Sequence, residues 1–308
     1  MNIVVIGGAG FIGTNLAIKL SENLENKILL VDRNLNFFND AVKIGNVQLR
    51  QSTLNCEDDF AFLEGQDVLY HLVSTTVPTT SNQNISLELQ ENVVFSSILL
   101  EKCVCYGVKK VVFISSGGTV YGKEVNCPLS EETPLKPISS YGMQKVAIEN
   151  LLYLYHYICG LDYRVIRLSN PYGPYQRPNG ILGAVTTFVF KALNKDEIQV
   201  YGDGTIIRDF IYIDDAVRGI LNIVHGECEK RVFNLGCGYG TSIKEVIEIV
   251  KKIVGDVKVI YKERRKVDVP INYLNIARYE NYFGKLNPVS LEDGIRKTVE
   301  FMRENYSF

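Results

Sequence analysis

The chain has 308 residues, of which 46% are hydrophobic and 22% charged, and a formal net charge of −2. This length and composition allow a sizeable buried core in one large or two closely packed domains, and they exclude a disordered chain. No basic run stands out beyond KERRK at 262–266, so there is no electrostatic case for a nucleic-acid partner and small molecules are the expected ligands.

Cysteine and histidine usage argues against metals and disulfides. The seven cysteines form no C-x-x-C pair, and the three histidines do not alternate with them, so we expect neither a metal site nor a disulfide framework. The sequence starts directly with an apolar run, without a basic leader, and no apolar run reaches about 18 residues. We therefore expect a cytoplasmic protein with no membrane partner.

Short β-rich runs alternate with helical patterns through the first half of the chain. Near-continuous apolar strands separated by amphipathic helices are typical of a parallel sheet covered on both faces. We therefore predict an α/β fold with a doubly wound parallel sheet of the Rossmann type. The strands are expected at 2–6, 27–32, 67–73, 109–115, 163–169 and 231–238, and helices at 14–23, 88–106 and 141–159.

A change of pattern marks a second domain. The segment NPYGPYQRPNG at 170–180 is rich in Pro, Gly and Asn and can continue neither helix nor strand. Because RVFNLGCG at 231–238 looks like a further sheet strand, the larger domain is predicted to be discontinuous. We expect it to comprise residues 1–169 plus about 214–238, with a smaller C-terminal α/β domain from about 170–213 plus 239–308.

A glycine-rich turn follows the first expected strand. GGAGFIG places Gly7, Gly10 and Gly13 between that strand and the start of a helix. There, glycines let the backbone approach a pyrophosphate, and the helix N-terminus contributes N–H groups and the positive end of its dipole. The second strand ends in Asp32, whose carboxylate can accept hydrogen bonds from ribose hydroxyls and repels a 2′-phosphate. We therefore predict NAD rather than NADP, although the neighbouring Arg33 offers a way to accommodate a phosphate.

A reactive pair is expected at the start of the helix over 141–159. Tyr141 and Lys145 are four residues apart, so they share one helix face. A tyrosine is a poor base at neutral pH, but an adjacent ammonium and a cationic nicotinamide both stabilise its phenolate. Such a tyrosine can remove a hydroxyl proton while a hydride leaves the same carbon. The spacing alone also arises by chance in a chain with 18 tyrosines.

These motifs, with the hydroxyl-rich segment SSGGTVYG at 115–122, resemble the extended short-chain dehydrogenase/reductase family, and within it the nucleotide-sugar epimerase and dehydratase branch. The likeness extends to HLVSTTVP at 71–78, ENVVFSSILLEKC at 91–103 and SEETPLKP at 130–137, so it covers nearly the whole chain. It implies that the larger domain binds NAD and the smaller one a nucleotide sugar. The residues that it assigns to the cofactor are Gly7, Gly10, Phe11, Ile12, Gly13, Asp32, Leu54, Leu72, Asn92, Ser115, Tyr141 and Lys145.

The resemblance also assigns residues to the substrate. RLSNPYGP at 167–174 carries Asn170, which corresponds to the family's asparagine at the sugar nucleotide, and Arg208 in TIIRDF corresponds to an arginine at the diphosphate. Arg265 and Asp268 in RKVD match the family's R-x-G-D pattern except that Val267 replaces the glycine. Arginines suit a diphosphate because their planar fork donates bidentate, charge-assisted hydrogen bonds.

Several positions depart from the family pattern. The serine that usually joins Tyr and Lys is replaced by Gly117. Ser116 or Thr119 is therefore expected to orient the sugar hydroxyl, and Thr119 shares the side of Gly117 if the strand continues. Alternatively, the serines at 115 and 116 only support the nicotinamide or cap local backbone. Thr53 replaces an aspartate near the adenine, and Asn272 stands where some relatives have a tyrosine that limits bulk at the 2-position of the sugar.

The resemblance implies NAD-dependent 4-epimerisation of a nucleotide-activated hexose, with a UDP-sugar expected, through a 4-keto intermediate. A 4,6-dehydratase is disfavoured because Gly118 and Thr119 replace its Asp-Glu pair, whereas a reductase or dehydrogenase would use Tyr141 and Lys145 equally. A non-catalytic NAD-binding sensor or scaffold is the alternative of another class. The family also implies a homodimer, formed through the helices at 88–106 and 141–159, and a role in polysaccharide precursor synthesis.

Overall fold

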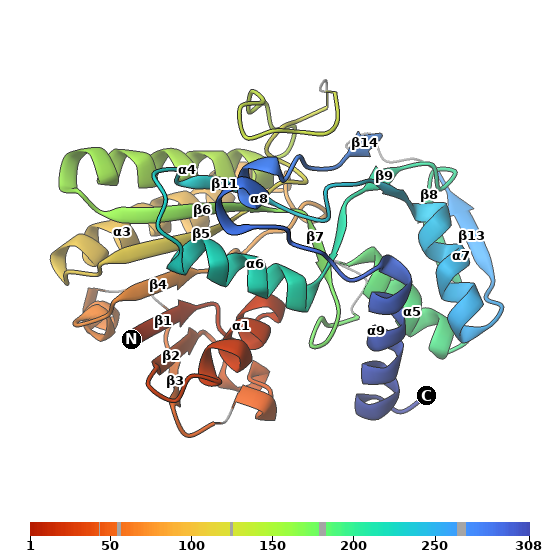
Figure 1. Cartoon of the computed structure of the whole chain (residues 1–308), viewed down its shortest axis with the longest axis horizontal. Helices are drawn as coiled ribbons and strands as arrows, with labels where there is room; N and C mark the ends of the chain where they lie inside the picture. The colour runs from red at the N-terminus through yellow and green to blue at the C-terminus, as the bar shows by residue number, and fades with distance from the viewer. Residues whose placement is uncertain (43, 54–56, 124–125, 179–182, 264–268) are drawn as a thin grey trace. The chain divides into compact units, whose positions relative to one another are not determined.

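A computed structural model describes residues 1–42, 44–53, 57–123, 126–178, 183–263 and 269–308 (Figure 1). The chain forms a seven-stranded sheet with the strand order β11–β6–β5–β4–β1–β2–β3, in which the pairs β1–β2, β1–β4, β2–β3 and β4–β5 are parallel. The order reverses beside β1, which is the feature of a doubly wound sheet at which ligands bind. The predicted fold class is therefore confirmed. The strands of this sheet are β1 (Asn2–Ile6), β2 (Lys27–Asp32), β3 (Val47–Gln51), β4 (Val68–His71), β5 (Lys110–Ser116), β6 (Asp162–Leu168) and β11 (Val232–Leu235).

The strands that were predicted from the sequence are those with continuous apolar runs. Val4 in β1, Leu30 in β2 and Val112 in β5 are completely buried, as the continuous apolar runs of a covered parallel sheet require. The edge strand β3 instead reads VQLRQ, with alternating apolar and polar residues, and it lay outside the strands expected from apolar runs. An edge strand faces solvent along one side, which removes the need for a continuous apolar sequence.

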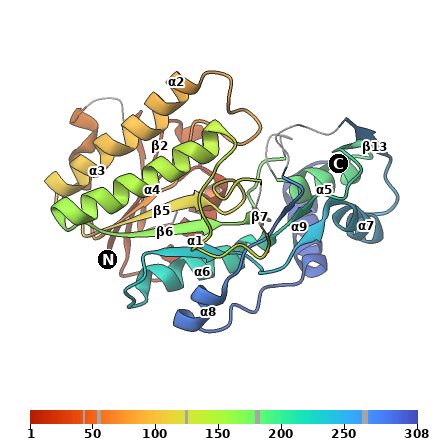
Figure 2. The same cartoon turned by 90° about the horizontal axis from the view of Figure 1, so that it is seen from above.

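Helices cover the sheet on both faces, with α3 and α4 side by side on one face and α1 on the other (Figure 2). The helix expected at 88–106 is interrupted, because Gln90–Val94 forms a π-helical turn between α2 and α3. The side chain of Asn92 in this turn donates a hydrogen bond to the Glu88 carbonyl at 2.9 Å, which explains the local departure from regular helix. The helices named here are α1 (Phe11–Ser21), α2 (Ile85–Leu89), α3 (Phe95–Cys105) and α4 (Ser140–Cys159), and three 3-10 turns lie at Leu35–Phe37, Asp40–Val42 and Glu57–Leu63.

The chain packs as two compact units. Unit 1 comprises Met1–Ser115, Ser139–Ile166 and Glu227–Val232, and unit 2 comprises Ser116–Ile138, Arg167–Gly226 and Phe233–Phe308. These units are defined by packing alone, so the division into an NAD-binding and a nucleotide-sugar-binding domain stays a prediction.

Unit 2 contains small sheets and its own helical layer, in which α5, α7 and α9 pack on one another. Its short strands join segments distant in sequence, since β9 pairs with both β12 and β14, β7 with β10 and β8 with β13. The strands are β7 (Asn170–Tyr172), β8 (Ile198–Tyr201), β9 (Ile207–Arg208), β10 (Phe210–Tyr212), β12 (Thr241–Ser242), β13 (Val259–Lys262) and β14 (Ile271–Asn272). The helices are α5 (Ala184–Leu193), α6 (Ile213–His225), α7 (Ile243–Val254), α8 (Ala277–Phe283) and α9 (Leu291–Asn305).

Three further observations bear on the expectations from composition. Over the described ranges, no helix has both the length and the apolar character needed to span a bilayer. The same part of the chain contains no group of three His, Cys, Asp or Glu side chains that could hold a metal ion. The cysteines that the structure describes, at positions 103, 105, 127, 159, 228 and 237, are free thiols.

Candidate active site

The loop between β1 and α1 is packed so closely that side chains are excluded from it. Gly7 has φ +82°, in the left-handed region, and a Cβ there would lie 3.1 Å from the backbone of Leu72 and Val73 after β4. A Cβ on Gly13 would lie 2.7 Å from the carbonyl oxygens of both Gly7 and Gly8. Two of the expected glycines are therefore required by close backbone packing, and Leu72 lies against the same loop.

The N-terminus of α1 is suited to a phosphate group. Its N-cap is Gly10, which provides no side-chain hydrogen bond to the first turn, and no acidic residue lies in that turn. Helix N-termini with unsatisfied N–H groups and a positive dipole end attract anions. Phe11 and Ile12, which begin the helix, are partly buried. These residues fit the pyrophosphate of a dinucleotide.

Asp32 ends β2 beside the glycine loop. Its carboxylate accepts a hydrogen bond from the backbone N–H of Ala9 at 3.1 Å, and the residue is partly exposed. A carboxylate held there can accept hydrogen bonds from ribose hydroxyls. Together the glycine loop, the α1 terminus and Asp32 fit NAD. Leu54, which the resemblance also assigned to the cofactor, lies outside the described residues.

Asn92 supports the segment after β4. Its side-chain amide donates to Thr75 Oγ1 at 2.8 Å, and its Oδ1 accepts the Thr75 N–H at 2.9 Å. Only 4% of Asn92 is exposed, so the amide is buried with its partners. The structure thus ties Asn92 to the backbone that follows β4, and direct contact with the cofactor stays a prediction.

Tyr141 and Lys145 lie one turn apart at the start of α4. The Lys145 ammonium is 5.5 Å from the centre of the Tyr141 ring and 4.6 Å from that of Phe113, and it donates a hydrogen bond to the Ile114 carbonyl at 3.0 Å. Burial lowers the pKa of Lys145 to about 8, while the nearby Glu149 carboxylate acts in the opposite direction. Lys145 is therefore still mainly an ammonium at neutral pH, and a positive charge beside Tyr141 favours its phenolate.

A buried polar network fixes the start of α4. Gln144 donates from Nε2 to Ser140 Oγ at 2.9 Å and to Glu88 Oε2 at 3.2 Å, and the Ser140 N–H donates to Asn82 Oδ1 at 2.7 Å. Hydrogen bonds from the Ser140 side chain and from backbone N–H groups lower the pKa of the Glu88 carboxyl. Because Ser140 precedes Tyr141 directly, this network limits the movement of Tyr141.

In unit 2, the chain turns sharply after Ser116. The N–H groups of Thr119 and Val120 both donate to the Ser116 carbonyl, each at 3.2 Å, so the extended conformation ends there. The condition of continued strand, under which Thr119 would share the side of Gly117, is therefore not met. Thr119 Oγ1 is nevertheless buried and has no hydrogen-bond partner among the described residues.

The absence of a serine at position 117 has a steric explanation. A Cβ on Gly117 would lie 2.6 Å from Leu274 Cδ1 and 3.0 Å from the Arg167 carbonyl oxygen. Leu274 is completely buried, and the neighbouring Asn272 donates from Nδ2 to the Gly117 carbonyl at 3.3 Å. The space that the usual serine would need is thus filled by Leu274.

Asp209 joins several segments of unit 2. Its buried carboxylate accepts backbone hydrogen bonds from Cys237 at 2.7 Å and Leu274 at 3.3 Å, while its carbonyl accepts from the Asn170 side chain at 2.8 Å. Burial raises the pKa of Asp209 to about 6, against the opposing effect of these N–H donors. One residue therefore holds both Asn170 and the segment that carries Leu274.

Arg208 and Asn272 are brought together by the pairing of β9 with β14, in which they are direct partners. The Arg208 guanidinium donates to the carbonyls of Ile207 at 2.8 Å and Val269 at 2.7 Å. These bonds hold its direction within unit 2. Arg265 and Asp268, predicted from the RKVD segment, lie outside the described residues.

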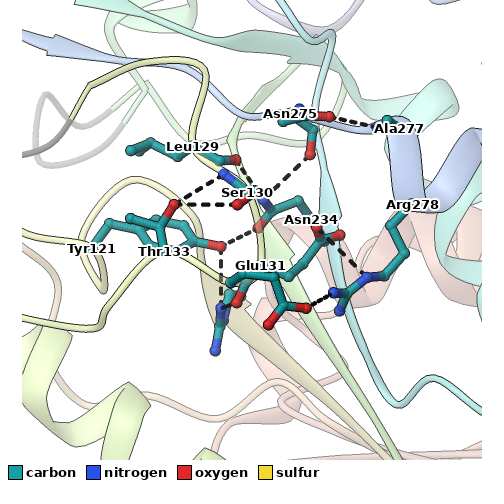
Figure 3. Close-up of polar contacts among 11 residues, drawn as sticks. Tyr121, Leu129, Ser130, Glu131, Thr133, Asn234, Asn275, Ala277 and Arg278 are labelled. Atoms are coloured by element: carbon teal, nitrogen blue, oxygen red, sulfur yellow. Dashed lines mark hydrogen bonds and ion pairs between the residues drawn. The ribbon is translucent and has the colours of Figure 1, made fainter.

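A second buried network supports the segment that packs on Gly117 (Figure 3). Tyr121 donates to Asn234 Oδ1 at 2.5 Å, and the Asn234 side chain donates to the Leu129 carbonyl at 2.8 Å. Glu131 accepts the Asn234 N–H at 2.9 Å. Leu129 forms an isolated parallel bridge with Leu274, so this network reaches the residue that fills the space above Gly117.

Three of these side chains were not expected from the sequence. Asp209 directly follows Arg208, and Glu149 lies one helical turn after Lys145, so position beside a predicted site residue could have drawn attention to both. Leu274 had no local signal because its contact with Gly117 joins segments far apart in the chain.

A doubly wound sheet with this glycine loop and a Tyr-x-x-x-Lys pair on α4 belongs to the class of dinucleotide-dependent enzymes. Comparison with known proteins specifies the family. Residues 3–236 match the NAD dependent epimerase/dehydratase family, and the chain belongs to it. NAD is therefore its cofactor, as predicted.

Individual relatives resemble the chain over nearly its whole length. A putative UDP-glucose 4-epimerase of Methanocaldococcus jannaschii is 33% identical, with 98% of this chain and 99% of the relative covered. A UDP-glucose 4-epimerase from Thermotoga maritima, solved with UDP-glucose, has a TM-score of 0.91 at 35% identity and 99% coverage of both chains. The Thermus thermophilus UDP-glucose 4-epimerase complex with NAD has a TM-score of 0.90 at 27% identity, covering 99% of this chain and all of that one. Other similar proteins are named as dTDP-sugar reductases or dehydratases.

We predict that Gly13→Ala weakens NAD binding by about 5- to 150-fold. The added methyl group would lie 2.7 Å from two carbonyl oxygens. The loop must therefore shift, and shifts forced by such overpacking cost about 1–3 kcal/mol of free energy. Calorimetric titration with NAD, after bound NAD has been removed from the protein, measures the effect. Gly10→Ala is the matched control, since its Cβ meets one carbonyl oxygen at 3.2 Å and the loss should be smaller. Equal affinity in wild type and Gly13→Ala would contradict the steric argument.

We predict that Gly117→Ser, which restores the family's usual residue, destabilises the protein by about 1–3 kcal/mol because the new side chain collides with Leu274. Urea unfolding measures this loss. Gly118→Ser is the control, because a Cβ there has no neighbour closer than 3.9 Å. Leu274→Val should reduce the cost of the serine in a double-mutant cycle, and strictly additive effects would count against the proposed collision.

Proposed function

We propose that the protein is an NAD-dependent 4-epimerase of a nucleotide-activated hexose, with a UDP-sugar as substrate. The observation that carries the proposal is the Lys145 ammonium held 5.5 Å from the centre of the Tyr141 ring, where it favours the phenolate. Similar full-length proteins named as UDP-glucose 4-epimerases support this choice of reaction and substrate.

Tyr141 is the proposed proton acceptor and donor. Its phenolate takes the proton of the sugar's 4-hydroxyl as C4 is oxidised, and the phenol returns a proton to the C4 oxygen when the 4-keto sugar is reduced on its other face. NAD, when bound, supplies the acceptor and later the donor of the hydride. Lys145 keeps a positive charge beside Tyr141 through both steps. The reaction consumes no cofactor.

Side chains of unit 2 are proposed to bind the sugar nucleotide. Asn170 and Arg208, with Arg265 and Asp268, take the nucleotide and diphosphate contacts, as the resemblance implies. Thr119, whose buried hydroxyl has no partner in the described structure, or Ser116 is proposed to orient the sugar hydroxyl.

Asn272 is proposed to set the space available at the 2-position of the sugar. Asn272 is 1% exposed, and its side-chain amide donates to the Gly117 carbonyl. An asparagine also occupies less space than the tyrosine that some relatives have at this position. We therefore include N-acetylated sugars among the proposed substrates.

The alternatives differ in the residues that they need. A 4,6-dehydratase expels the 6-hydroxyl with an acid and a base, and Gly118 and Thr119 provide neither carboxyl group. A nucleotide-sugar reductase would use Tyr141 and Lys145 in the same way, so only the fate of the substrate distinguishes it. A non-catalytic sensor or scaffold would not need the Tyr141 hydroxyl.

We further propose a cytoplasmic location and a role in polysaccharide precursor synthesis.

The protein is also proposed to form a homodimer. The expected surface is formed by α3 and α4, which pack on each other. Tyr153, Tyr157 and Ile158 on α4 are 61%, 79% and 61% exposed, and Ile98 on α3 is 41% exposed. Exposed apolar side chains on adjacent helices are typical of an interface between subunits.

We predict that the purified protein, without added NAD, converts UDP-glucose, UDP-galactose or their N-acetyl counterparts to the 4-epimer, as followed by proton NMR. Tyr141→Phe should lower the rate by about 100-fold or more, because it removes the proton-transfer group. Tyr153→Phe, an exposed tyrosine on the same helix, is the matched control and should retain the rate.

Undiminished turnover in Tyr141→Phe would overturn the catalytic assignment. Failure of the NAD-bound wild type to convert any of the four sugars would overturn their 4-epimerisation and point to a reductase or a binding role.

We predict that the epimerisation rate falls as the pH rises above about 8, where Lys145 loses its proton. The sign follows from the charge, since the ammonium that stabilises the Tyr141 phenolate is present below that pH and absent above it. Initial rates at saturating sugar nucleotide, corrected for any change in bound NAD, measure the profile. A rate that stays constant through about pH 10 would contradict this role of Lys145.

A further inference from the structure

A buried carboxylate lies beside the reactive pair and has no part in the proton transfer described above. Glu149 is on α4, one helical turn after Lys145 and two turns after Tyr141. Only 7% of Glu149 and 5% of Lys145 are exposed. Because an ionised carboxylate is costly to bury without partners, its place in the interior calls for compensating contacts.

The first of these contacts is with the end of β5. The hydroxyl of Ser115, which is 3% exposed, donates a hydrogen bond to Glu149 Oε1 at 2.5 Å. The preceding residue, Ile114, accepts the hydrogen bond from the Lys145 ammonium at 3.0 Å. Adjacent residues of β5 thus hold the Lys145 ammonium and the Glu149 carboxylate, which lie one turn apart on α4.

The second contact is electrostatic. Glu149 supplies a negative charge that raises the pKa of Lys145, against the larger opposing effect of burial. His71 on β4 also faces Lys145, but burial and the ammonium lower the pKa of His71 to about 3, so it stays uncharged at neutral pH. Tyr141 faces Lys145 from α4, and Tyr163 on β6 lies near Glu149, its own pKa raised by burial. Among these groups, Glu149 is the one whose charge favours the ammonium form of Lys145.

We propose that Glu149 is a positioning residue for Lys145. Held by Ser115, it keeps a negative charge beside the buried ammonium, so that Lys145 stays protonated and directed toward Tyr141. Its place in the reaction rests on the function proposed above, whereas its effect on Lys145 does not. A purely structural role, in which Glu149 only joins α4 to β5, would leave the ionisation of Lys145 unchanged.

The test measures the ionisation of Lys145 directly. Protein purified with its bound NAD and labelled with carbon-13 at the lysine Cε atoms is titrated by NMR, and the Lys145 signal is identified by its loss in Lys145→Arg. Because burial separates the titration of Lys145 from that of exposed lysines, its signal should change at a distinctly lower pH. The central variant is Glu149→Gln, which removes the charge but keeps an oxygen able to accept the Ser115 hydroxyl.

In Glu149→Gln we expect proton binding by Lys145 to weaken about tenfold, and the fall in epimerisation rate at high pH to begin at a correspondingly lower pH. Glu149→Asp, which keeps the charge, should restore part of both. Glu91→Gln makes the same substitution at an exposed site and should change neither. An unchanged Lys145 titration in folded Glu149→Gln would overturn the proposal.

Folding of the variants also decides the matter. Glu149→Met removes the charge without introducing an unpaired amide, and it is measured in the same way if Glu149→Gln does not fold. Failure of both to fold would contradict the proposal, because it would show that the fold itself requires the carboxylate. The lysine titration needs no sugar nucleotide, so a protein that fails to epimerise UDP-sugars but shows the shift in Lys145 would lose only the proposed function.

Discussion

The buried ammonium of Lys145 is the constraint on which the reactive end of unit 1 depends. A charge removed from water must be compensated, and here the compensation comes from the Ile114 carbonyl, the face of the Phe113 ring and the carboxylate of Glu149. These partners belong to two elements, β5 and α4, so holding the charge also holds the helix against the strand. Tyr141 takes its position from that helix, which links the solvation of one side chain to the chemistry proposed for another.

In unit 2 the main constraint is steric. Leu274 occupies the space beside Gly117, and Asp209 binds the Leu274 backbone while its carbonyl holds Asn170. The family's usual serine therefore cannot be added here without moving a completely buried leucine. Thr119 Oγ1, also in unit 2, is buried without a hydrogen-bond partner among the described residues.

Local patterns were sufficient to predict the fold class, the NAD cofactor and the family. Continuous apolar runs identify covered parallel strands. In the GGAGFIG turn after β1, Gly7 and Gly13 are required because a Cβ at either position would collide with backbone atoms. The four-residue spacing of Tyr141 and Lys145 was enough to put them on one helix face. These features are readable because each depends on neighbours within a few residues, so periodicity and motif spacing carry the information.

Contacts between distant segments could be decided only by the tertiary structure. The turn after Ser116, which removes Thr119 from strand alternation, is closed by hydrogen bonds to the Ser116 carbonyl. The Gly-Gly pair at 117–118 is compatible with a turn, but the sequence does not show which N–H groups close it. The collision between Gly117 and Leu274 and the hydrogen bond between Ser115 and Glu149 join residues far apart in the chain. The sequence by itself determined the scaffold and the placing of Tyr141 and Lys145 on one helix face. Packing across the chain decided which side chains surround them, because burial and charge compensation depend on all neighbours in space.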